Sequence, residues 1–325
     1  MSIDISSQAP LVSVIIPTYN RQSYLKQAIE SAINQKYQNI EIIVSDDCSP
    51  ENPQPLISSF QDSRIRFYRN QKNLGICQNV VNGFKLAQGK YVASLNDDDM
   101  WNEDFLEILV PHLEANPDLV LAFSDYYIMD SQGKINYPAT EDDTRRWKRD
   151  RLKQGIYKPF YELGIVHQAV FLAVATVMRR DAINWDDIPP EAGLFWDLYM
   201  TYLACRSGKG AYYHPGKLTR YRVHTQSETM ISGKSSVQAK IRTGKAGIFC
   251  YERFKSDENL QEFRPFFERK WAQANTTLGV GLMRSGLLAE ARPYFWNALN
   301  LQKFDLRTIT ALMLSFTPTS IASRF

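Results

Sequence analysis

The sequence has few of the residues that build metal centres and disulfide frameworks. Among 325 residues there are only four histidines and four cysteines, and no two cysteines form a C-x-x-C pair. This spacing argues against a zinc site and against a disulfide-stabilised secreted domain, and it is typical of a reducing compartment. The cysteines are Cys48, Cys77, Cys205 and Cys250.

Long apolar runs and a strong net charge are also missing. The longest apolar run, 169–178, is too short to cross a bilayer. Residues 1–10 form a polar, acidic tail without the basic start and apolar core of a signal peptide. The formal net charge of +3 is too small to favour a nucleic-acid partner. We therefore expect a cytoplasmic protein, at most peripheral on the inner face of the membrane.

Two glycine-rich phosphate-binding motifs are absent. No G-x-G-x-x-G follows the first apolar run, and no G-x-x-x-x-G-K-[ST] occurs in the sequence. A dinucleotide fingerprint and a P-loop are thereby excluded. Phosphate binding by this chain would have to use a metal ion instead of a glycine-rich loop.

The first hundred residues contain an alternation of strand and helix patterns. Apolar, β-branched runs predict buried strands, and runs with helical spacing of apolar residues separate them. The strands are predicted at 11–16, 40–44, 65–68 and 91–95, and the helices at 23–35, 56–60 and 77–87. This alternation predicts an α/β fold with a doubly wound, mostly parallel sheet flanked by helices.

The pattern is less regular after residue 100. Helices are predicted at 105–113 and 191–205, and strands at 119–123, 169–178 and 211–213. The densely charged segment 141–153, with basic residues around Trp147, is predicted to be a solvated loop. The alternative is a flap that contacts an anionic acceptor.

From residue 237 onward only helical patterns occur. Predicted helices at about 271–283 and 286–301 resemble one tetratricopeptide-type pair, which cannot bury its own apolar face and is expected to pack on the rest of the chain. A last helix at 306–316 is expected to pack on its neighbours, with peripheral membrane contact as the alternative. The predicted organisation is a tail at 1–10, an α/β domain at 11–235 and an all-α extension at 236–325, with a linker near 225–236.

Polar and acidic residues follow the predicted strands at one edge of the sheet. The first strand is followed by 17–20 (PTYN), the second by Asp46 and Asp47, and the fourth by 96–99 (NDDD). Ligands of open α/β sheets bind outside the carboxyl ends of the strands. Three adjacent carboxylates need a counter-charge, most simply a divalent cation. The alternative for 96–99 is an acidic loop or a helix cap.

Four motifs in this order resemble those of family 2 glycosyltransferases. They are 17–20 (PTYN), 44–49 (VSDDCS), 73–75 (NLG) and 95–99 (LNDDD), and the resemblance covers residues 10–224. It implies a GT-A fold for 11–235 and an inverting reaction. It also implies a nucleotide-diphospho-sugar donor and Mn²⁺ or Mg²⁺ as the cofactor.

The resemblance implies roles for individual residues. Pro17, Tyr19 and Asp47 would border the nucleoside, with Asn20 in the same donor-binding motif and Asp47 on the base. Asp98 aligns with the metal ligand, and Asp97 would lie near the ribose and the diphosphate.

The sequence departs from the family pattern at two places. Asn96 stands where the first acid of the D-x-D element is expected, and Val80-Val81 stand where an Arg-Asn pair is frequent. Asn79 is predicted to replace that Asn in donor binding. Arg220 and Arg222 are predicted to supply the missing phosphate contact, with solvated surface charges as the alternative.

An inverting transfer needs a general base that deprotonates the acceptor hydroxyl. The segment 195–198 (FWDL) resembles the family's E-D or W-D motif, which makes Asp197 the candidate base and Trp196 a wall of the acceptor site. The alternatives are a helix-terminal Asp and a core aromatic. The segment 220–224 (RYRVH) resembles the family's Y-R-x-H element, so His224 is predicted to contact the metal or diphosphate, with a surface His as the alternative.

The predicted function is an inverting, metal-dependent glycosyltransferase. It would move a sugar from a nucleotide-diphospho-sugar to a hydroxyl of a glycan or lipid-linked acceptor, in cell-surface polysaccharide synthesis. One alternative is a nucleotidyltransferase that makes a nucleotide sugar, although 17–21 lacks the glycine-rich, basic loop that such enzymes carry. The other is a non-catalytic protein that binds nucleotide sugars.

Overall fold

The structure is a computed structural model that describes residues 9–225, 236–318 and 322. The chain forms two compact units. The first contains Met1–Pro189 and Asp197–Val223, and the second contains Pro190–Trp196 and His224–Phe325. Residues 226–235 of the predicted linker lie outside the described residues.

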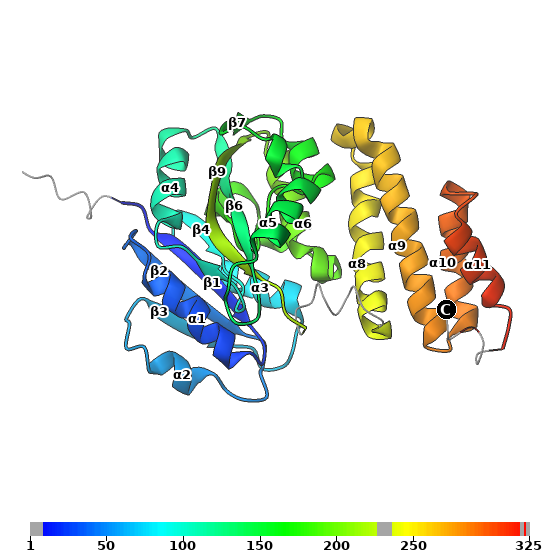
Figure 1. Ribbon diagram of the computed structural model, residues 1–325, viewed down its shortest axis with the longest axis horizontal. Coiled ribbons are helices and arrows are strands. Elements are labelled where there is room, and N and C mark those ends of the chain that lie inside the picture. Colours follow the sequence, from blue (N-terminus) through cyan, green and yellow to red (C-terminus); the bar gives the residue numbers. More distant parts are fainter. Residues whose placement is uncertain (1–8, 226–235, 319–321, 323–325) are drawn as a thin grey trace, which may run out of the picture. The chain divides into compact units, whose positions relative to one another are not determined.

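The first unit is built on a nine-stranded sheet (Figure 1). Its first four strands are β1 (Val12–Thr18), β2 (Ile40–Asp46), β3 (Ile65–Arg69) and β4 (Tyr91–Ser94). They pair in parallel, as predicted, and their order in the sheet is β3-β2-β1-β4. Thr18 pairs with Asp46, so the carboxyl ends of β1 and β2 lie side by side.

The rest of the sheet is mixed. β8 (Thr176–Arg179) runs antiparallel between β4 and β6 (Leu119–Met129), and β9 (Gly210–Arg222) is parallel to β6. β5 (Met100–Trp101) and β7 (Gly155–Tyr157) pair antiparallel with β9. The predicted strand at 169–178 is therefore regular only in its last part, and the predicted strand at 211–213 is much longer.

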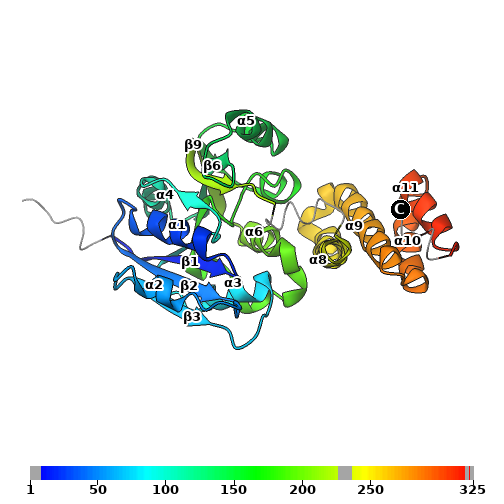
Figure 2. The same cartoon turned by 60° about the horizontal axis from the view of Figure 1, so that its bottom comes forward.

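Helices cover both faces of the sheet, as the doubly wound prediction requires (Figure 2). The helices of this part are α1 (Gln22–Ile33), α2 (Gln54–Ser58), α3 (Ile76–Lys85), α4 (Phe105–Ala115) and α6 (Trp196–Arg206). Val14 and Ile16 of β1 pack in one core with Leu25 of α1. Ile15 faces the other way, because a Cβ at Gly83 of α3 would lie 2.6 Å from its Cγ2. Alternate residues of β1 thus pack against helices on opposite faces of the sheet.

The charged segment 141–153 differs from its prediction as a solvated loop. It lies within α5 (Tyr137–Arg146) and a 3-10 turn at Arg149–Arg151. Arg149 is buried; its Nε lies 2.7 Å from Oδ1 of Asp125 on β6, and its Nη2 lies 2.7 Å from Oδ2 of Asp143. Its guanidinium also lies 4.1 Å from the ring centroid of Tyr126. The prediction of a loop was wrong, and Arg149 is buried rather than solvated. The basic residues Arg145, Arg146, Arg151 and Lys153 are exposed, as predicted.

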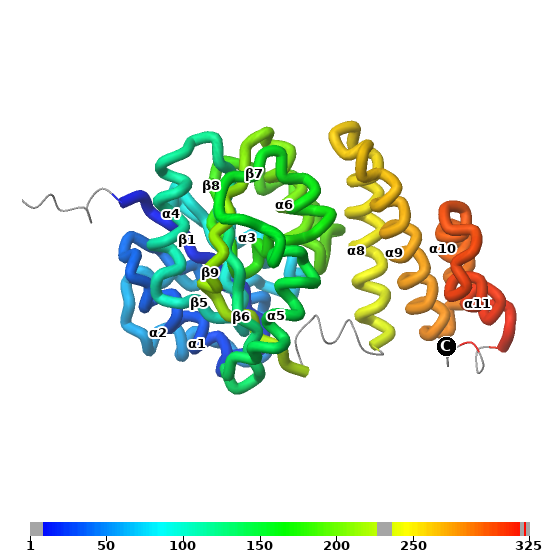
Figure 3. The backbone as a smooth tube through the Cα atoms, turned by 45° about the horizontal axis from the view of Figure 1, so that its top comes forward, coloured from blue at the N-terminus to red at the C-terminus, as the bar shows by residue number. Residues whose placement is uncertain are grey.

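The second unit is helical, as predicted (Figure 3). Its helices are α8 (Val237–Ser256), α9 (Arg264–Arg284), α10 (Leu288–Leu301) and α11 (Leu306–Leu314), with 3-10 turns at Pro190–Phe195 and Glu258–Phe263. α9 packs against α8 and α10, and α10 packs against α11. A Cβ at Gly244 would lie 2.7 Å from Cβ of Leu278, so this glycine lets α8 and α9 approach closely. Within the described residues, the helices are too short or too polar to cross a membrane.

Candidate active site

The acidic residues after β4 lie against the end of β1. Oγ1 of Thr18 donates to Oδ2 of Asp97 at 2.7 Å, which ties the two strand ends together. Nη1 of Arg21 lies 3.0 Å from Oδ1 of Asp97 and 2.9 Å from Oδ2 of Asp98. Parallel pairing of β1 with β4 places these motifs at one edge of the sheet, as the strand-end argument predicts.

The acidic loop holds the side chains of Asp97, Asp98 and Asp99 close together and away from water. Burial, and then the charge of Asp98, raise the pKa of Asp97 to about 6, although Arg21 and Thr18 act in the opposite direction. Burial and Asp98 also raise the pKa of Asp99 well above its usual range. Asp99 accepts hydrogen bonds from Nδ2 of Asn96 at 3.0 Å and from a backbone N–H at 2.8 Å. A site of this kind attracts a further cation.

Arg222 is buried against the backbone of the acidic loop. Its side chain is buried, Nε donates to the carbonyl oxygen of Asp98 at 2.7 Å, and Nη2 donates to Oε1 of Gln27 at 2.8 Å. Its backbone N–H is the one that Asp99 binds. Arg220, two residues earlier on β9, donates from Nε to Oδ1 of Asn102 at 3.0 Å. Arg222 therefore positions the acidic loop, a role that differs from its predicted contact with phosphate.

Asp47 is buried at the end of β2 and organises the loop before α3. Its carboxylate accepts the backbone N–H groups of Leu74 and Gly75, both at 2.8 Å, and Nδ2 of Asn70 at 3.0 Å. Gly75 has φ +83°, a conformation that favours glycine. Asp47, which is predicted to contact the nucleoside, therefore also holds the 73–75 loop in place through these hydrogen bonds.

Asn79 is buried on α3 and connects that helix to β2. Its Nδ2 donates to the carbonyl oxygen of Ser45 at 2.8 Å, and its Oδ1 accepts from Oγ of Ser45 and Nδ2 of Asn70. This differs from the predicted donor contact, since its amide bonds to protein groups on both sides. Asn79 and Asn70 together align the ends of β2, β3 and α3.

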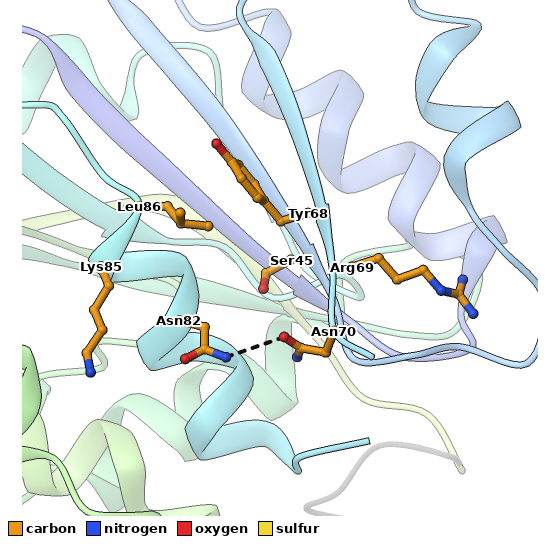
Figure 4. A pocket seen from close by; sticks show the side chains of 7 residues that line it. All are labelled: Ser45, Tyr68, Arg69, Asn70, Asn82, Lys85 and Leu86. Carbon is orange, nitrogen blue, oxygen red and sulfur yellow. Dashed lines mark hydrogen bonds between the residues drawn. The ribbon is translucent and has the colours of Figure 1, made fainter. Parts of the chain in front are cut away.

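A pocket of about 330 Å³ borders this network (Figure 4). Its lining comes from β2, β3 and the residues that follow β3, and from α3 and its last turn. Nδ2 of Asn82 donates to Oδ1 of Asn70 at 3.3 Å across the pocket wall. The lining residues are Ser45, Tyr68, Arg69, Asn70, Asn82, Lys85 and Leu86.

Tyr19 and Asn20, two of the predicted donor-binding residues, lie at the surface just after β1. Pro17 is buried in the strand, whereas Tyr19 is 46% exposed and Asn20 is exposed. Asn20 has φ +57°, and its backbone N–H donates to Oγ of Ser49 at 2.8 Å, which links the first motif to the second. An exposed Tyr ring beside buried carboxylates suits stacking with a planar ligand.

Asp197, the candidate base, lies in the first turn of α6. Its Oδ1 accepts the backbone N–H of Leu198 at 2.8 Å, and in the described parts of the chain no basic side chain forms an ion pair with it. Burial raises the pKa of Asp197 to about 6. Trp196 and His224 are both buried and belong to the second unit. Their predicted contacts with the acceptor and the metal stay predictions.

Asp97 and Asp98 are the residues that could hold a divalent cation. They offer hard carboxylate oxygens, and Mg²⁺ is typically held by one or two carboxylates plus substrate phosphates. Across residues 9–225, 236–318 and 322, no group of three or more His, Cys, Asp or Glu side chains is arranged to hold a metal. The donor set therefore fits a cation that a bound diphosphate also coordinates.

Three contributors to the site were not predicted from the sequence. Thr18 contacts Asp97, and Arg21 contacts both Asp97 and Asp98. Asn70 contacts Asp47. Thr18 belongs to the first motif, and Arg21 directly follows it, so their positions in the sequence were a usable signal. Asn70 follows β3 and belongs to no motif, and only the folded arrangement reveals its contact with Asp47.

Sequence comparisons find a family model and relatives that match this chain. The profile of "Glycosyl transferase family 2" matches residues 13–180, which is just over half of the chain. An uncharacterized glycosyltransferase of Haemophilus influenzae is 28% identical over 237 residues, covering 71% of each protein. The putative colanic acid biosynthesis glycosyl transferase WcaA of Escherichia coli is 34% identical over 128 residues, which cover 39% of this chain and 45% of WcaA.

Solved structures share the fold at low sequence identity. TarS of S. aureus in complex with UDP-GlcNAc has a TM-score of 0.58 and 15% identity, covering 94% of this chain and 90% of that one. The mannosyltransferase PcManGT of Pyrobaculum calidifontis, in complex with GDP-Man and Mn²⁺, has a TM-score of 0.57 and 15% identity, covering 98% and 88%. These likenesses confirm the predicted GT-A fold. Together with the matching profile, they show that the chain belongs to glycosyltransferase family 2 and is a glycosyltransferase.

Proposed function

We propose that the protein transfers a sugar, with inversion, from a nucleotide-diphospho-sugar to a hydroxyl group of a glycan or lipid-linked acceptor. The observation that carries this proposal is the buried Asp97–Asp98 pair beside the end of β1, whose two carboxylates Arg21 bridges. A diphosphate with a divalent cation complements such a site. The names of two structural neighbours support this donor class, since one binds UDP-GlcNAc and the other GDP-Man.

Asp98 would hold the cation, with Mn²⁺ or Mg²⁺ suited to its oxygen donors, and Asp97, which is predicted to lie near the ribose and the diphosphate, offers a second carboxylate beside it. When bound, such a cation supplies the positive charge that stabilises a leaving nucleoside diphosphate. Arg21 holds both carboxylates in place from the β1 side. Tyr19 and the 73–75 loop, which Asp47 fixes, would border the nucleoside.

Asp197 is the proposed general base. Its carboxylate would accept the proton of the acceptor hydroxyl while that oxygen attacks the anomeric carbon and the bond from this carbon to the diphosphate oxygen breaks. A new glycosidic bond forms, the nucleoside diphosphate leaves, and the configuration inverts. A pKa of about 6 keeps the group ionised near neutral pH yet basic enough to take a proton.

The acceptor class is proposed from a relative. WcaA is described as acting in colanic acid biosynthesis, so a role in polysaccharide synthesis at the cell surface is proposed for this chain as well. The alignment covers less than half of WcaA, so the particular acceptor is not carried over.

Release of nucleoside diphosphate from UDP-, GDP- and dTDP-sugars tests the proposal. Each donor is incubated with Mn²⁺, with Mg²⁺ or with chelator, and with a mixture of lipid-linked and soluble saccharide acceptors. Metal-dependent release from one donor supports a transferase and identifies its sugar. Pyrophosphate release from a nucleoside triphosphate and sugar phosphate would instead support a nucleotidyltransferase. Donor binding without turnover would support a non-catalytic partner protein.

A further inference from the structure

Large exposed apolar side chains are concentrated on the last two helices of the described chain. Phe304 is 89% exposed, Leu306 77% and Met313 67%. We call the group the terminal apolar face, and its members are Trp296, Leu301, Phe304, Leu306, Met313 and Phe316. Soluble proteins rarely gather so many exposed apolar residues without a binding function.

The members on α11 lie on one side of that helix. Thr308, Ala311 and Leu312 are buried and form its inner side. Leu306 and Met313 are seven residues apart, so they share the opposite side, two helical turns from each other. α11 is therefore apolar on its outer side as well as its inner one.

Arg292 of α10 contacts the two residues that directly follow α11. Its Nη2 donates to the carbonyl oxygen of Ser315 at 2.8 Å, and its guanidinium lies 4.3 Å from the ring centroid of Phe316. Trp296 follows Arg292 by four residues and so lies one turn further along the same side of α10. These contacts place the exposed ring of Phe316 next to α10.

The charges on this surface are predominantly basic. Lys303 and Arg307 are exposed and stand next to Phe304 and Leu306 in the sequence. The nearby acid, Asp305, is engaged as the N-cap of α11, where Oδ1 accepts the backbone N–H and Oγ1 of Thr308, both at 2.7 Å. Aromatic and aliphatic side chains among basic ones are the composition of segments that lie in a membrane interface.

We propose that the terminal apolar face binds the surface of an anionic lipid bilayer. The apolar side chains would enter the interface between head groups and acyl chains, and Lys303 and Arg307 would contact the anionic head groups. A second copy of the chain fits less well, because a two-fold contact on this face brings the same basic residues of both copies together. The proposal does not depend on the transfer reaction.

Flotation of the full chain with vesicles tests this proposal. Vesicles of phosphatidylcholine with phosphatidylglycerol are compared with vesicles of phosphatidylcholine alone. We expect binding to the anionic vesicles that weakens as salt is raised. The double variant Phe304→Ser/Leu306→Ser should bind at least about tenfold more weakly, because it loses two interfacial side chains. The double variant Lys303→Glu/Arg307→Glu should weaken binding by about tenfold or more.

The matched control is Ile156→Ser, which removes a 54% exposed apolar side chain from β7 in the first unit and should leave vesicle binding unchanged. Thermal unfolding followed by circular dichroism checks that each variant is folded. We expect melting temperatures close to that of the wild type, because the substituted residues are exposed. The proposal is overturned if the wild-type chain does not float with anionic vesicles, or if the Phe304→Ser/Leu306→Ser variant floats equally well. Lipid-free dimerisation that the same variant abolishes would assign the face to a second copy instead.

Discussion

Nη1 of Arg21 lies 2.9 Å from Oδ2 of Asp98, and the same nitrogen bridges to Oδ1 of Asp97 at 3.0 Å. A guanidinium thus stands between the two carboxylates that are expected to bind a cation. Arg21 comes from the segment after β1 and the two acids from the segment after β4, so one side chain joins the first and last motifs of the donor site. Its positive charge offsets part of the repulsion between the two carboxylates.

Replacement of Arg21 tests this counter-charge. Arg21→Met should lower the free energy of unfolding by about 2 kcal/mol, since it leaves two buried carboxylates without their cation. Added Mn²⁺ should raise the melting temperature of the variant more than that of the wild type, because the ion restores the lost charge. The control is Arg64→Met, whose ion pair with Asp62 has a similarly exposed arginine, 24% against 22% for Arg21. Equal Mn²⁺ shifts in all three proteins would contradict the account.

Asp197→Asn should separate chemistry from donor binding. The amide cannot accept the acceptor proton, so turnover should fall by about 10²–10⁴-fold. Donor affinity, measured by calorimetry, should stay within about twofold, because the substituted group does not contact the nucleotide in this mechanism. Normal turnover of this variant would remove Asp197 from the role of base.

The same substitution should stabilise the fold at neutral pH. The pKa of Asp197 is about 6 in the folded protein against 3.8 as the ordinary value. A raised carboxyl pKa makes ionisation unfavourable in the folded state, so this cost is absent below about pH 4 and complete above about pH 6. Asp197→Asn removes up to about 3 kcal/mol of cost at pH 7 and none at pH 4. Urea unfolding of both proteins at the two pH values measures the difference, and equal stability at pH 7 would contradict a buried, uncompensated carboxylate.

The activity should fall at low pH, because the proposed general base, Asp197, becomes protonated. Since only the ionised carboxylate accepts a proton, kcat/KM should fall about tenfold for each pH unit below about pH 6 and level off above it. The measurement is a pH profile of nucleoside diphosphate release at saturating metal. A profile that stays flat down to pH 5 would mean that another group takes the proton.

Arg149 should stabilise the fold far more than its neighbours in the same charged segment. Arg149→Met removes the guanidinium from the buried carboxylate of Asp125 and the half-buried one of Asp143 and leaves Asp125 with only Lys217 as a cationic partner, which costs about 3 kcal/mol. Arg145→Met breaks only an exposed pair with Asp142, for which about 0–1 kcal/mol is expected. Denaturant unfolding measures the free energy of unfolding of the two variants. Similar decreases in both would show that the buried Arg149–Asp125 pair does not stabilise the fold more than the exposed pair does.

Much of the donor half could be predicted because its signals are local. An apolar run followed by acids, as at β4 and 96–99, contains both the strand and its functional end in one short segment. Arg149 could not be placed in this way, since its partner Asp125 lies 24 residues away on β6 and a charged run alone predicts solvent exposure. The hydrogen bonds of Asp47 to the 73–75 loop depend on side-chain orientation, which spacing does not encode.

Calorimetry of nucleoside diphosphates tests the central claim most directly. UDP, GDP and dTDP are titrated into the wild-type chain and into Asp98→Asn, each with Mn²⁺ and with chelator. The account predicts that one nucleotide binds the wild type with Mn²⁺, and that both chelation and Asp98→Asn weaken this binding by at least about tenfold. Binding that is equally tight in all four conditions would contradict a metal-dependent site at Asp98. Absence of binding by all three nucleotides would contradict the proposed donor class.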